Sequence, residues 1–482
     1  MKMFIDGTRV DASDGAAFDV VNSATQEFID TAPRATEQDV RKAIDAAVRG
    51  KRAWAATPVH ERSRLLTACA DAIDARREEL ARSLSSEMGK IIREAKPEIR
   101  VCAQILRGFA EKAAHHYGHT MTEYQVGTEN DIIFTRREPL GIVACISPFN
   151  YPVELCTQKF ASALAAGNAV IIKPASDNPL TVMRVVEICL DCGLPGDVLQ
   201  LVTGGGAMVG ELLAKSDKIQ AISLTGSTPV GLQIAELGAR TLKRVFLELG
   251  GNDPFIVFDD ADLEAAICDA AMGRVQNAGQ TCCAPKRFLV HNPVKRRFVE
   301  GVIQRIKNLK LGSPLDESTD LGSLISERAA GEVHKQVRLT VEQGATLLHG
   351  GRIYDKTYYE PTILDDVTPD MDVARDLEIF GPVLPIIGFD GEDEAVEIAN
   401  ATCYGLQAGV MTSDMGRAMR VASRLACGGV VINSSGNYRH MDQPFGGCKM
   451  SGVGREGVSV TLDEMTQEKS YILKNVLQPP PL

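Results

Sequence analysis

The residues with the clearest capacity for chemistry are the neighbouring cysteines Cys282 and Cys283. A Gly-Gln-Thr lead-in at 279–281 and an Ala-Pro step at 284–285 flank the pair, so the thiols are predicted at a change of chain direction, where a nucleophile is accessible. Free cysteine is also among the most buried residue types and usually serves as a small hydrophobic side chain, and this chain has 12 cysteines, so the pair by itself favours a core role. A nucleophilic role therefore depends on the other groups that a cysteine mechanism requires.

Two further side chains are candidates for such a mechanism. Glu248 lies among apolar neighbours just before a double glycine, and a carboxylate in that setting tends to have a raised pKa, which suits a general base. A paired structural charge explains Glu248 equally well. Asn150 follows an apolar run and offers a neutral amide donor, which suits either an oxyanion hole or a turn.

Glycine-rich turns elsewhere are candidates for binding phosphate. Residues 204–210 follow an apolar run, but they lack the Gly-x-Gly-x-x-Gly spacing, and three glycines also form ordinary turns. Residues 225–231 lead into a predicted helix, whose free N–H groups would attract phosphate or simply be capped by Ser or Thr. The segments 378–382 and 444–452 are either site loops or plain connections.

The elements that would position these groups follow an α/β pattern from residue 138 onward. Short runs that are apolar throughout alternate with amphipathic helical segments, as in parallel sheets covered on both faces. Each of the first four runs ends in a turn-rich segment, and ligands of open parallel sheets bind beyond the carboxyl ends of the strands. The predicted strands are residues 142–146, 169–172, 199–202 and 221–224, with a second set near 254–258, 286–291, 383–388, 408–411 and 429–432.

The first part of the chain is predicted to contain a hairpin, helices and an extended segment. Residues 4–12 have the pattern of a hairpin, and Thr36 with Asp39 resembles the capping box that opens a long helical region. Residues 120–137 indicate extended structure, because β-branched and aromatic side chains recur there. At the other end of the chain, the Pro479–Pro481 tail is expected to be exposed.

Composition excludes several classes of function. A length of 482 residues, with 44% hydrophobic and 24% charged, is typical of a soluble globular protein with two or three domains. The net charge of −11 argues against a nucleic-acid binder or an anionic-membrane binder, and no apolar run approaches the ~18 residues of a membrane span. The start of the chain does not resemble a signal peptide, and scattered cysteines fit a reducing compartment, so a cytoplasmic location is expected. Cys189 and Cys192 form a C-x-x-C pair within a helical core pattern, and no metal site is predicted.

Taken together, these segments resemble the aldehyde dehydrogenase superfamily. The resemblance covers residues 140–456, in the family's order and approximate spacing, and it is specific because it rests on seven motifs rather than one. The motifs are Pro148-Phe149-Asn150, Lys173-Pro174, Thr225-Gly226-Ser227, Glu248-Leu249-Gly250-Gly251, Gly279-Gln280-Thr281-Cys282, Glu378-Ile379-Phe380-Gly381-Pro382 and Pro444-Phe445-Gly446-Gly447.

The resemblance implies an α/β fold with two Rossmann-like open-sheet domains and a β arm used in oligomerisation. The cofactor-binding domain would comprise residues 1–119 and 138–247, and the catalytic domain residues 248–462. The arm would comprise residues 120–137 and 463–482. A homodimer or a homotetramer is expected.

The resemblance also implies the catalytic roles. Cys282, the residue after Gly-Gln-x, would attack the aldehyde carbonyl to give a thiohemiacetal, whose oxyanion the Asn150 amide and the Cys282 N–H would hold. After oxidation to a thioester, Glu248 would activate the water that hydrolyses it. Lys159 and Glu456 match residues implicated in proton relays of the family.

NAD or NADP is the cofactor that the resemblance implies. Many NAD-preferring relatives have Glu where this chain has Ser176, so the repulsion of a 2′-phosphate is absent, and NADP is expected to be tolerated or preferred. The alternative is that Ser176 only allows NADP to bind as well as NAD, without creating a preference for it. The residues matching cofactor contacts are Ser147, Pro148, Phe149, Lys173, Ser176, Gly206, Gly210, Thr225, Gly226, Ser227, Leu249, Glu378 and Phe380.

The predicted substrate is a small polar aldehyde, with anionic aldehydes included in the class. Arg439 and His440 precede Phe445 in a loop that is less basic in many relatives, and Arg100 lies in a helix that lines the entrance in relatives. Arg439 is equally well explained as a surface or interface salt bridge.

Two alternative functions remain at this point. A CoA-acylating aldehyde dehydrogenase would pass the acyl group to CoA, although enzymes of that kind generally lack the base at the position of Glu248. A catalytically silent binding or structural protein on the same fold is the other alternative, and the presence of Cys282, Glu248 and Asn150 together argues against it.

Overall fold

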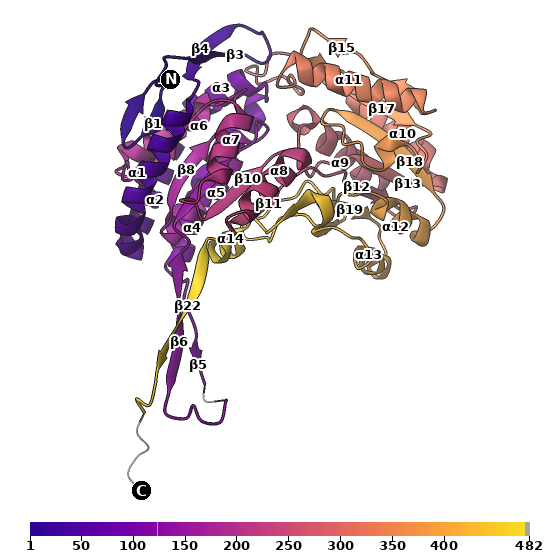
Figure 1. Cartoon of the computed structure of the whole chain (residues 1–482). Coiled ribbons are helices and arrows are strands. Elements are labelled where there is room, and N and C mark those ends of the chain that lie inside the picture. Colours follow the sequence, from indigo (N-terminus) through magenta and orange to yellow (C-terminus); the bar gives the residue numbers. More distant parts are fainter. Residues whose placement is uncertain (123, 478–482) are drawn as a thin grey trace.

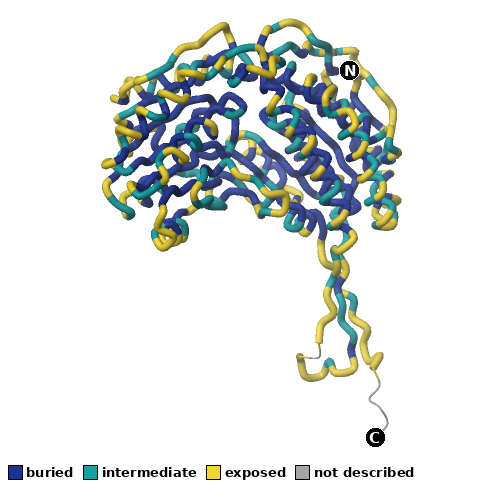
Figure 2. The backbone as a smooth tube through the Cα atoms, turned by 180° about the vertical axis from the view of Figure 1, so that it is seen from behind, coloured by how far each residue is buried: buried dark blue, intermediate teal, exposed yellow. Residues whose placement is uncertain are grey.

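The computed structural model describes residues 1–122 and 124–477, which form two sheets flanked by helices and a projecting arm (Figure 1). The predicted exposed tail Pro479–Pro481 lies outside the described residues. Buried residues concentrate along the strands of both sheets and the helices against them, whereas the arm is largely exposed (Figure 2).

The first sheet has eight strands in the order β2-β1-β9-β8-β7-β10-β11-β21. Its five central strands run parallel, and antiparallel partners flank them on each side. The predicted strands and the N-terminal hairpin are confirmed here, whereas β11 was not among the predicted strands. The strands are β1 (Met3–Ile5), β2 (Thr8–Val10), β7 (Ile142–Ile146), β8 (Ala169–Lys173), β9 (Leu199–Leu201), β10 (Ala221–Thr225), β11 (Arg244–Glu248) and β21 (Gly452–Val453).

The second sheet has seven strands in the order β14-β17-β18-β13-β12-β19-β20. All neighbours are parallel except β14 and β17, and the second set of predicted strands is confirmed. The strands are β12 (Pro254–Val257), β13 (Arg287–His291), β14 (Thr346–His349), β17 (Thr362–Asp365), β18 (Val383–Phe389), β19 (Gln407–Met411) and β20 (Gly429–Ile432). Two small hairpins complete the body: β3 (Ala17–Val21) with β4 (Phe28–Pro33), and β15 (Ile353–Tyr354) with β16 (Tyr358–Tyr359).

Helices connect the strands and supply most of the remaining core. The capping box predicted at Thr36 and Asp39 is present at the start of α1. The helical core position predicted for the C-x-x-C pair is confirmed for Cys189, which is buried within α6, whereas Cys192 directly follows the helix and is half-buried. The helices are α1 (Glu37–Ala56), α2 (Val59–Ala75), α3 (Arg77–Met88), α4 (Ile92–Ala113), α5 (Pro152–Ala166), α6 (Leu180–Asp191), α7 (Gly206–Lys215), α8 (Thr228–Ala239), α9 (Leu263–Val275), α10 (Asn292–Ile306), α11 (Glu327–Glu342), α12 (Glu392–Asn400), α13 (Met415–Ala422) and α14 (Val458–Glu464), with 3₁₀ turns η1 (Gln276–Gly279), η2 (Asp372–Ala374) and η3 (Lys449–Ser451).

The arm is a three-stranded antiparallel sheet that projects from the body (Figure 1). Strand β6 (Ile132–Pro139) lies between β5 (Thr120–Met121) and β22 (Thr466–Leu473). The extended structure predicted for residues 120–137 is confirmed at residues 120–121 and from residue 132 onward. The chain end returns to pair with β6 over eight residues, from Thr466 opposite Pro139 to Leu473 opposite Ile132.

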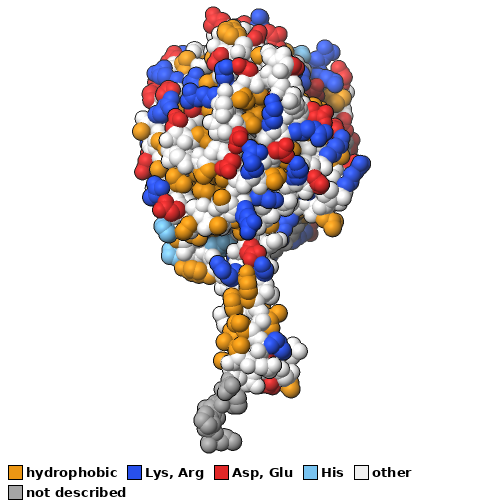
Figure 3. Space-filling view, turned by 60° about the vertical axis from the view of Figure 1, so that its left-hand side comes forward, with side chains coloured by type: hydrophobic (Ala, Val, Ile, Leu, Met, Phe, Trp, Pro, Cys, Tyr) orange, Lys and Arg blue, Asp and Glu red, His pale blue; other side chains and the backbone are white. Residues whose placement is uncertain are grey.

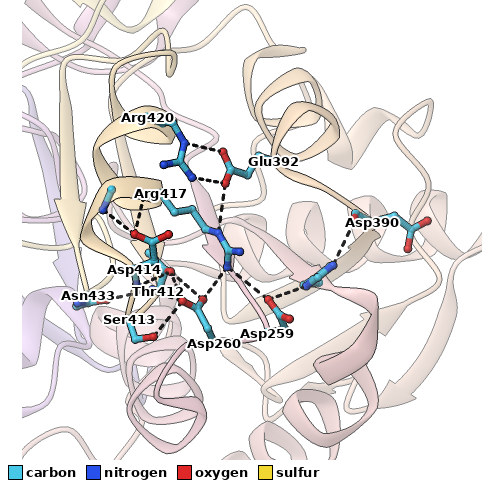
Figure 4. Close-up of polar contacts among 12 residues, drawn as sticks. Asp259, Asp260, Asp390, Glu392, Thr412, Ser413, Asp414, Arg417, Arg420 and Asn433 are labelled. Carbon is cyan, nitrogen blue, oxygen red and sulfur yellow. Dashed lines mark hydrogen bonds and ion pairs between the residues drawn. The ribbon is translucent and has the colours of Figure 1, made fainter.

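Polar side chains fix the loops at one end of the second sheet (Figure 4). The Asp260 carboxylate, which follows β12, accepts hydrogen bonds from Thr412, Ser413 and the Asp414 backbone N–H, and it pairs with Arg417 at 2.8 Å. Asp414 in turn caps α13. This cluster holds α13 against the ends of β12 and β19.

Candidate active site

A cavity of about 690 Å³ gathers the carboxyl ends of the parallel strands of the first sheet. Ligand sites of open α/β sheets lie at this position. The cavity also contains Cys282, which belongs to the segment 276–285, called here the cysteine loop, from the second half of the chain. The predicted residues in its wall are Ser147, Pro148, Phe149, Asn150, Lys173, Ser176, Gly206, Gly210, Thr225, Gly226, Ser227, Leu249, Cys282, Glu378 and Phe380.

The cysteine loop has an unusual backbone. Asn277 and Ala278 adopt left-handed conformations, with φ of 51° and 54°, and Gly279 follows with a φ of 77°. A Cβ on Gly279 would lie 2.2 Å from the carbonyl of Gly381, so only glycine fits this contact. The loop that carries Cys282 is thereby seated against the Gly-Pro turn that precedes β18.

Asn150 lies at the junction between β7 and α5. Its side-chain Nδ2 donates to the Gln280 carbonyl at 3.1 Å, which places the amide beside the cysteine loop. Its own carbonyl accepts hydrogen bonds from Lys90 Nζ and from Asn277 Nδ2, both at 2.9 Å. The amide predicted as an oxyanion donor is therefore next to the loop of the predicted nucleophile.

Glu248 ends β11, the strand that the sequence did not reveal. The side chain is buried, and its Oε1 has no hydrogen-bond partner among the described residues. Burial, then the charges of Glu456 and Cys282, raise the pKa of Glu248 well above its usual range. A carboxyl group with a high proton affinity near a thiol has the properties of a general base.

A buried charge cluster lies behind Glu248. Glu456 accepts from Lys159 Nζ at 2.7 Å and from Arg439 Nη2 at 2.8 Å. Although burial opposes ionisation, the charges of Lys159 and Arg439 lower the pKa of Glu456 to about 2. Glu456 is therefore held as a carboxylate between two cations, and at neutral pH it has no proton to pass on.

The Cys282 thiol is half-buried and touches its neighbour. The hydrogen bond with Cys283, followed by burial, raises the pKa of Cys282 well above its usual range, while the Lys286 ammonium opposes the shift. The resting residue is therefore a thiol, and a base must take its proton when it reacts.

Several features of the cavity fit a nicotinamide dinucleotide. Within residues 1–122 and 124–477, the Pro174 carbonyl, at 3.0 Å, is the one acceptor of Lys173 Nζ, and burial lowers the pKa of Lys173 to about 8. Ser176 Oγ donates to the Gly204 carbonyl at 2.8 Å. The buried Thr225 hydroxyl has no hydrogen-bond partner among the described residues, so it remains available to a ligand. These donors and the adjoining N-terminus of α8 are suited to ribose and phosphate groups.

The opposite end of the cavity combines an acid with aromatic rings. Phe380 packs edge-to-face against Phe149, with the ring centroids 5.9 Å apart. Glu378 lies 3.3 Å from Lys286 Nζ, which also donates to the Cys282 carbonyl. The predicted nicotinamide-side residues thus lie beside the cysteine.

The predicted substrate residues are only partly brought together. The Arg439 guanidinium stacks 4.2 Å above the Phe445 ring and pairs with Glu456, so it lies close to Glu248. His440 is exposed in the same loop, and its Nδ1 accepts from the Asp442 backbone. Arg100 lies elsewhere: its exposed side chain on α4 lines a separate surface pocket that does not include Cys282, because it points to the outer side of the helix.

The sequence did not reveal several residues of the site. Arg328 lines the cavity from the first turn of α11, and Lys286 bridges Glu378 and the cysteine loop. Lys286 is four residues after Cys282, and this short separation was the only feature of the sequence that could have indicated its place in the site. Arg328 has no motif around it.

Two further findings concern the described part of the chain. None of its helices is both long and apolar enough to cross a membrane. Within residues 1–122 and 124–477, no group of His, Cys, Asp and Glu side chains is arranged to hold a metal ion.

Comparison with known proteins defines the class to which this fold and site belong. A family model described as "Aldehyde dehydrogenase family" matches residues 10–471, and the chain therefore belongs to the aldehyde dehydrogenase family. It is an oxidoreductase that acts on aldehydes with NAD or NADP.

Individual relatives cover nearly the whole chain. It is 37% identical to the NADP-dependent succinate-semialdehyde dehydrogenase of Escherichia coli, over 96% of each protein. It is also 37% identical to the 3-sulfolactaldehyde dehydrogenase of Pseudomonas putida, over 98% of this chain and 97% of the relative. Among solved structures, an NAD-dependent aldehyde dehydrogenase from Sinorhizobium meliloti is 38% identical, with a TM-score of 0.96 over all of this chain and 95% of that one.

Proposed function

We propose that the protein oxidises a small polar aldehyde, anionic aldehydes included, and that Cys282, Asn150 and Glu248 carry the reaction. The observation that supports this most directly is that Glu248 ends β11 of the first sheet and Cys282 lies in the loop before β13 of the second sheet, yet the two are close enough for the charge of one to act on the other.

The first half of the reaction forms a covalent bond to the enzyme. Cys282 Sγ attacks the carbonyl carbon, and Glu248 takes the thiol proton, directly or through water. The carbonyl oxygen becomes an oxyanion, which the Asn150 amide and the Cys282 backbone N–H stabilise. The cavity residues would hold NAD(P)⁺, which would supply the hydride acceptor that this oxidation needs. Loss of a hydride from the thiohemiacetal carbon leaves a thioester on Cys282.

The second half releases the acid. Once the proton taken from Cys282 has passed to solvent, Glu248 takes a proton from water, the resulting hydroxide adds to the thioester carbon, and the C–S bond breaks to give a carboxylic acid and the Cys282 thiolate. Glu248 then returns its proton to the thiolate, which restores the resting thiol. Glu456 is held as a carboxylate by Lys159 and Arg439, so its role in this proposal is electrostatic. Its negative charge raises the proton affinity of Glu248.

The substrate class rests on Arg439. Its one hydrogen-bonded partner among the described residues is Glu456, through Nη2, so its other N–H groups are available to an anionic or polar substituent of the aldehyde. The relatives that act on succinate semialdehyde and 3-sulfolactaldehyde, each carrying an anionic group, agree with this choice. Arg100, which lies outside the cavity, is not part of the proposal.

The proposal also covers the cofactor, the cellular location and the oligomeric state. Ser176 presents a hydroxyl rather than a carboxylate to the cavity, which supports the use of NADP as well as NAD. A cysteine-based enzyme with all twelve cysteines free fits the cytoplasm. A homodimer or homotetramer built through the arm is supported by the hydrophobic side chains on the surface of the arm (Figure 3).

The test is an initial-rate panel of aldehydes with NAD and NADP in parallel, for the wild type and for Arg439→Met. The panel pairs anionic aldehydes, such as succinate semialdehyde and sulfoacetaldehyde, with neutral aliphatic aldehydes of similar length. We expect the variant to raise KM for the anionic members by about tenfold or more and to change KM for the neutral members much less, since one charge-assisted contact is worth about 1.5–3 kcal/mol.

Two outcomes would contradict parts of this proposal. An equal effect of Arg439→Met on both groups of aldehydes would remove the anion contact while leaving the reaction in place. Formation of acyl-CoA when CoA is added, in place of the free acid, would instead identify a CoA-acylating enzyme.

A further inference from the structure

Three charged side chains at the start of α4 form a stripe beside the active site. Lys90 precedes the helix, and Glu94 and Glu98 follow at intervals of four residues, which places the two acids on one helical face. The Lys90 and Glu98 side chains are 0% and 1% exposed, and Lys90 Nζ lies 2.5 Å from Glu98 Oε2. A fully buried ion pair therefore lies behind the catalytic loops.

Lys90 directs its ammonium group at the segment that carries Asn150. Nζ donates to the Asn150 carbonyl at 2.9 Å, and it lies 3.5 Å from the centroid of the Tyr151 ring. Together with Glu98, these contacts occupy the ammonium group on three sides. The backbone of Asn150 is thereby tied to a fixed point in the core.

The two acids bind the two elements that adjoin Asn150, which are the N-terminus of α5 and the cysteine loop. Glu98 Oε1 accepts from the backbone N–H groups of Val153 and Glu154, at 3.0 and 3.3 Å, and so caps the N-terminus of α5. Glu94 Oε2 accepts from the Asn277 N–H at 2.9 Å. The stripe therefore contacts both the helix that begins after Asn150 and the cysteine loop.

Stability alone does not account for this pair. Removing two charges from water is costly, and replacing a buried ion pair by apolar residues of similar volume is often neutral or stabilising. Hydrophobic neighbours are available, because Ile92, Ala95 and Ile99 of the same helix are fully buried. The pair differs from them in its directed contacts, and these converge on Asn150 and on the first turn of α5.

We propose that Lys90 and Glu98 are positioning residues that hold the Asn150 amide in place for the developing oxyanion. Lys90 fixes the Asn150 carbonyl, Glu98 fixes both Lys90 and the first turn of α5, and the Asn150 side chain is left to turn only about its own bonds. This inference rests on the proposed oxyanion role of Asn150. It goes beyond that role by assigning the orientation of the amide to a charge pair that does not touch the substrate.

The test is a double-mutant cycle between Lys90→Met and Asn150→Ala, read by the single-turnover rate of NAD(P)H formation. Lys90→Met is expected to slow this step by about tenfold to a hundredfold, because a displacement of about 1 Å can cost a factor of that order. In the Asn150→Ala background the same change is expected to have little further effect, since the amide that it positions is absent. Cofactor affinity, measured by fluorescence quenching, should not change.

A matched control removes an ion pair that does not contact Asn150. Lys295 Nζ lies 2.7 Å from Asp365 Oδ1 in the second sheet, and Lys295→Met should leave the single-turnover rate at the wild-type value. Because Lys90→Met leaves the Glu98 charge buried and can unfold the protein, the double variant Lys90→Met/Glu98→Leu is measured as well. It removes both charges, so it should remain folded and still show the slow step.

The possible results separate this inference from the function on which it rests. Additive effects in the cycle, or a wild-type single-turnover rate in Lys90→Met/Glu98→Leu, would show that the pair is merely structural, while the role of Asn150 would stand. If Asn150→Ala itself does not slow NAD(P)H formation, the oxyanion role fails and this inference fails with it.

Discussion

The Cys282 thiol has a neighbour that works against its ionisation. The hydrogen bond with Cys283 is the largest cause of its raised pKa, ahead of burial. A high pKa protects the thiol from oxidation and from metal capture while no substrate is bound, since the thiolate is the reactive form. The cost is that a base must assist each turnover, and Glu248 has the proton affinity for that task.

Replacing Cys283 should therefore make Cys282 easier to ionise. In Cys283→Ala the contribution that raises the pKa of Cys282 is lost, so the thiolate fraction at a given pH increases. We expect the alkylation rate of Cys282 by iodoacetamide, followed on its own tryptic peptide, to rise at lower pH than in the wild type. An unchanged pH profile would mean that burial alone sets the pKa.

At this scale the sequence was informative where the motifs were specific. Cys282, Asn150 and the cofactor residues were predicted from seven ordered motifs, and the cavity contains them. Lys90 and Glu98 were not found, because a Lys and a Glu near a helix start have no signature that separates a buried pair from a solvent-exposed one. Arg100 was placed by analogy with relatives, and its side chain lines a separate surface pocket instead of the cavity.

At the scale of the elements, the cysteine loop and the turn before β18 pack so closely that only glycine fits between them. Gly279 has a φ of 77°, and a Cβ there would lie 2.2 Å from the Gly381 carbonyl, so two motifs distant in sequence require each other. The local backbone strain at Asn277 and Ala278 is held by this contact and by the hydrogen bond from the Asn277 N–H to Glu94.

The substitution Gly279→Ala should therefore reduce both stability and activity. We expect a loss of about 1–3 kcal/mol in the free energy of unfolding, because the residue is left-handed and the added methyl group has no space. The single-turnover rate should fall because Cys282 moves with the loop. Denaturant unfolding and rapid-mixing kinetics measure the two effects.

A control for this change is available within α11. Gly331 is helical and has nothing within 4 Å of an added Cβ, so Gly331→Ala should be neutral or stabilise the protein by up to about 1 kcal/mol. Wild-type stability and activity in Gly279→Ala would contradict the packing argument.

The positions of the strands in the sequence were easier to predict than the order of the strands within each sheet. The apolar runs identified most strands of both sheets, because buried parallel strands are apolar throughout. β11 was missed because its first residues, Arg244 and Val245, are not fully buried and the run is short. The order of the strands depends on crossovers between distant segments, which a local pattern does not encode.

At the scale of the whole molecule, the arm is the part whose stability packing against the core does not explain. β6 and β22 pair along their full length although more than three hundred residues separate them. Met121, Val126, Ile472 and Leu473 are exposed on this sheet or its loop, and an isolated three-stranded sheet gains little from its own packing. The pairing of the two segments was expected only from the family resemblance, because no local pattern joins them.

A charge on the arm should weaken assembly if the arm lies in a subunit interface. We expect Ile472→Asp to shift the protein toward smaller species in size-exclusion chromatography with light scattering, since a buried charge at an interface is costly. Phe28→Asp, at a similarly exposed position on β4, serves as the control and should leave the size unchanged. A single unchanged oligomer for Ile472→Asp would place the interface elsewhere.

The most direct test of the central claim is to stop the reaction between its two halves. In Glu248→Gln the base for both halves is lost, but the Cys282 proton can still leave to solvent water, whereas attack of water on the thioester has no other base. Hydrolysis of the thioester should therefore be slowed far more than the oxidation step. Mixing this variant with NADP⁺ or NAD⁺ and a preferred aldehyde should give a burst of NAD(P)H close to one per active site, and mass spectrometry should find the acyl group on Cys282. Normal steady-state turnover, or an acyl group on any residue other than Cys282, would contradict the account.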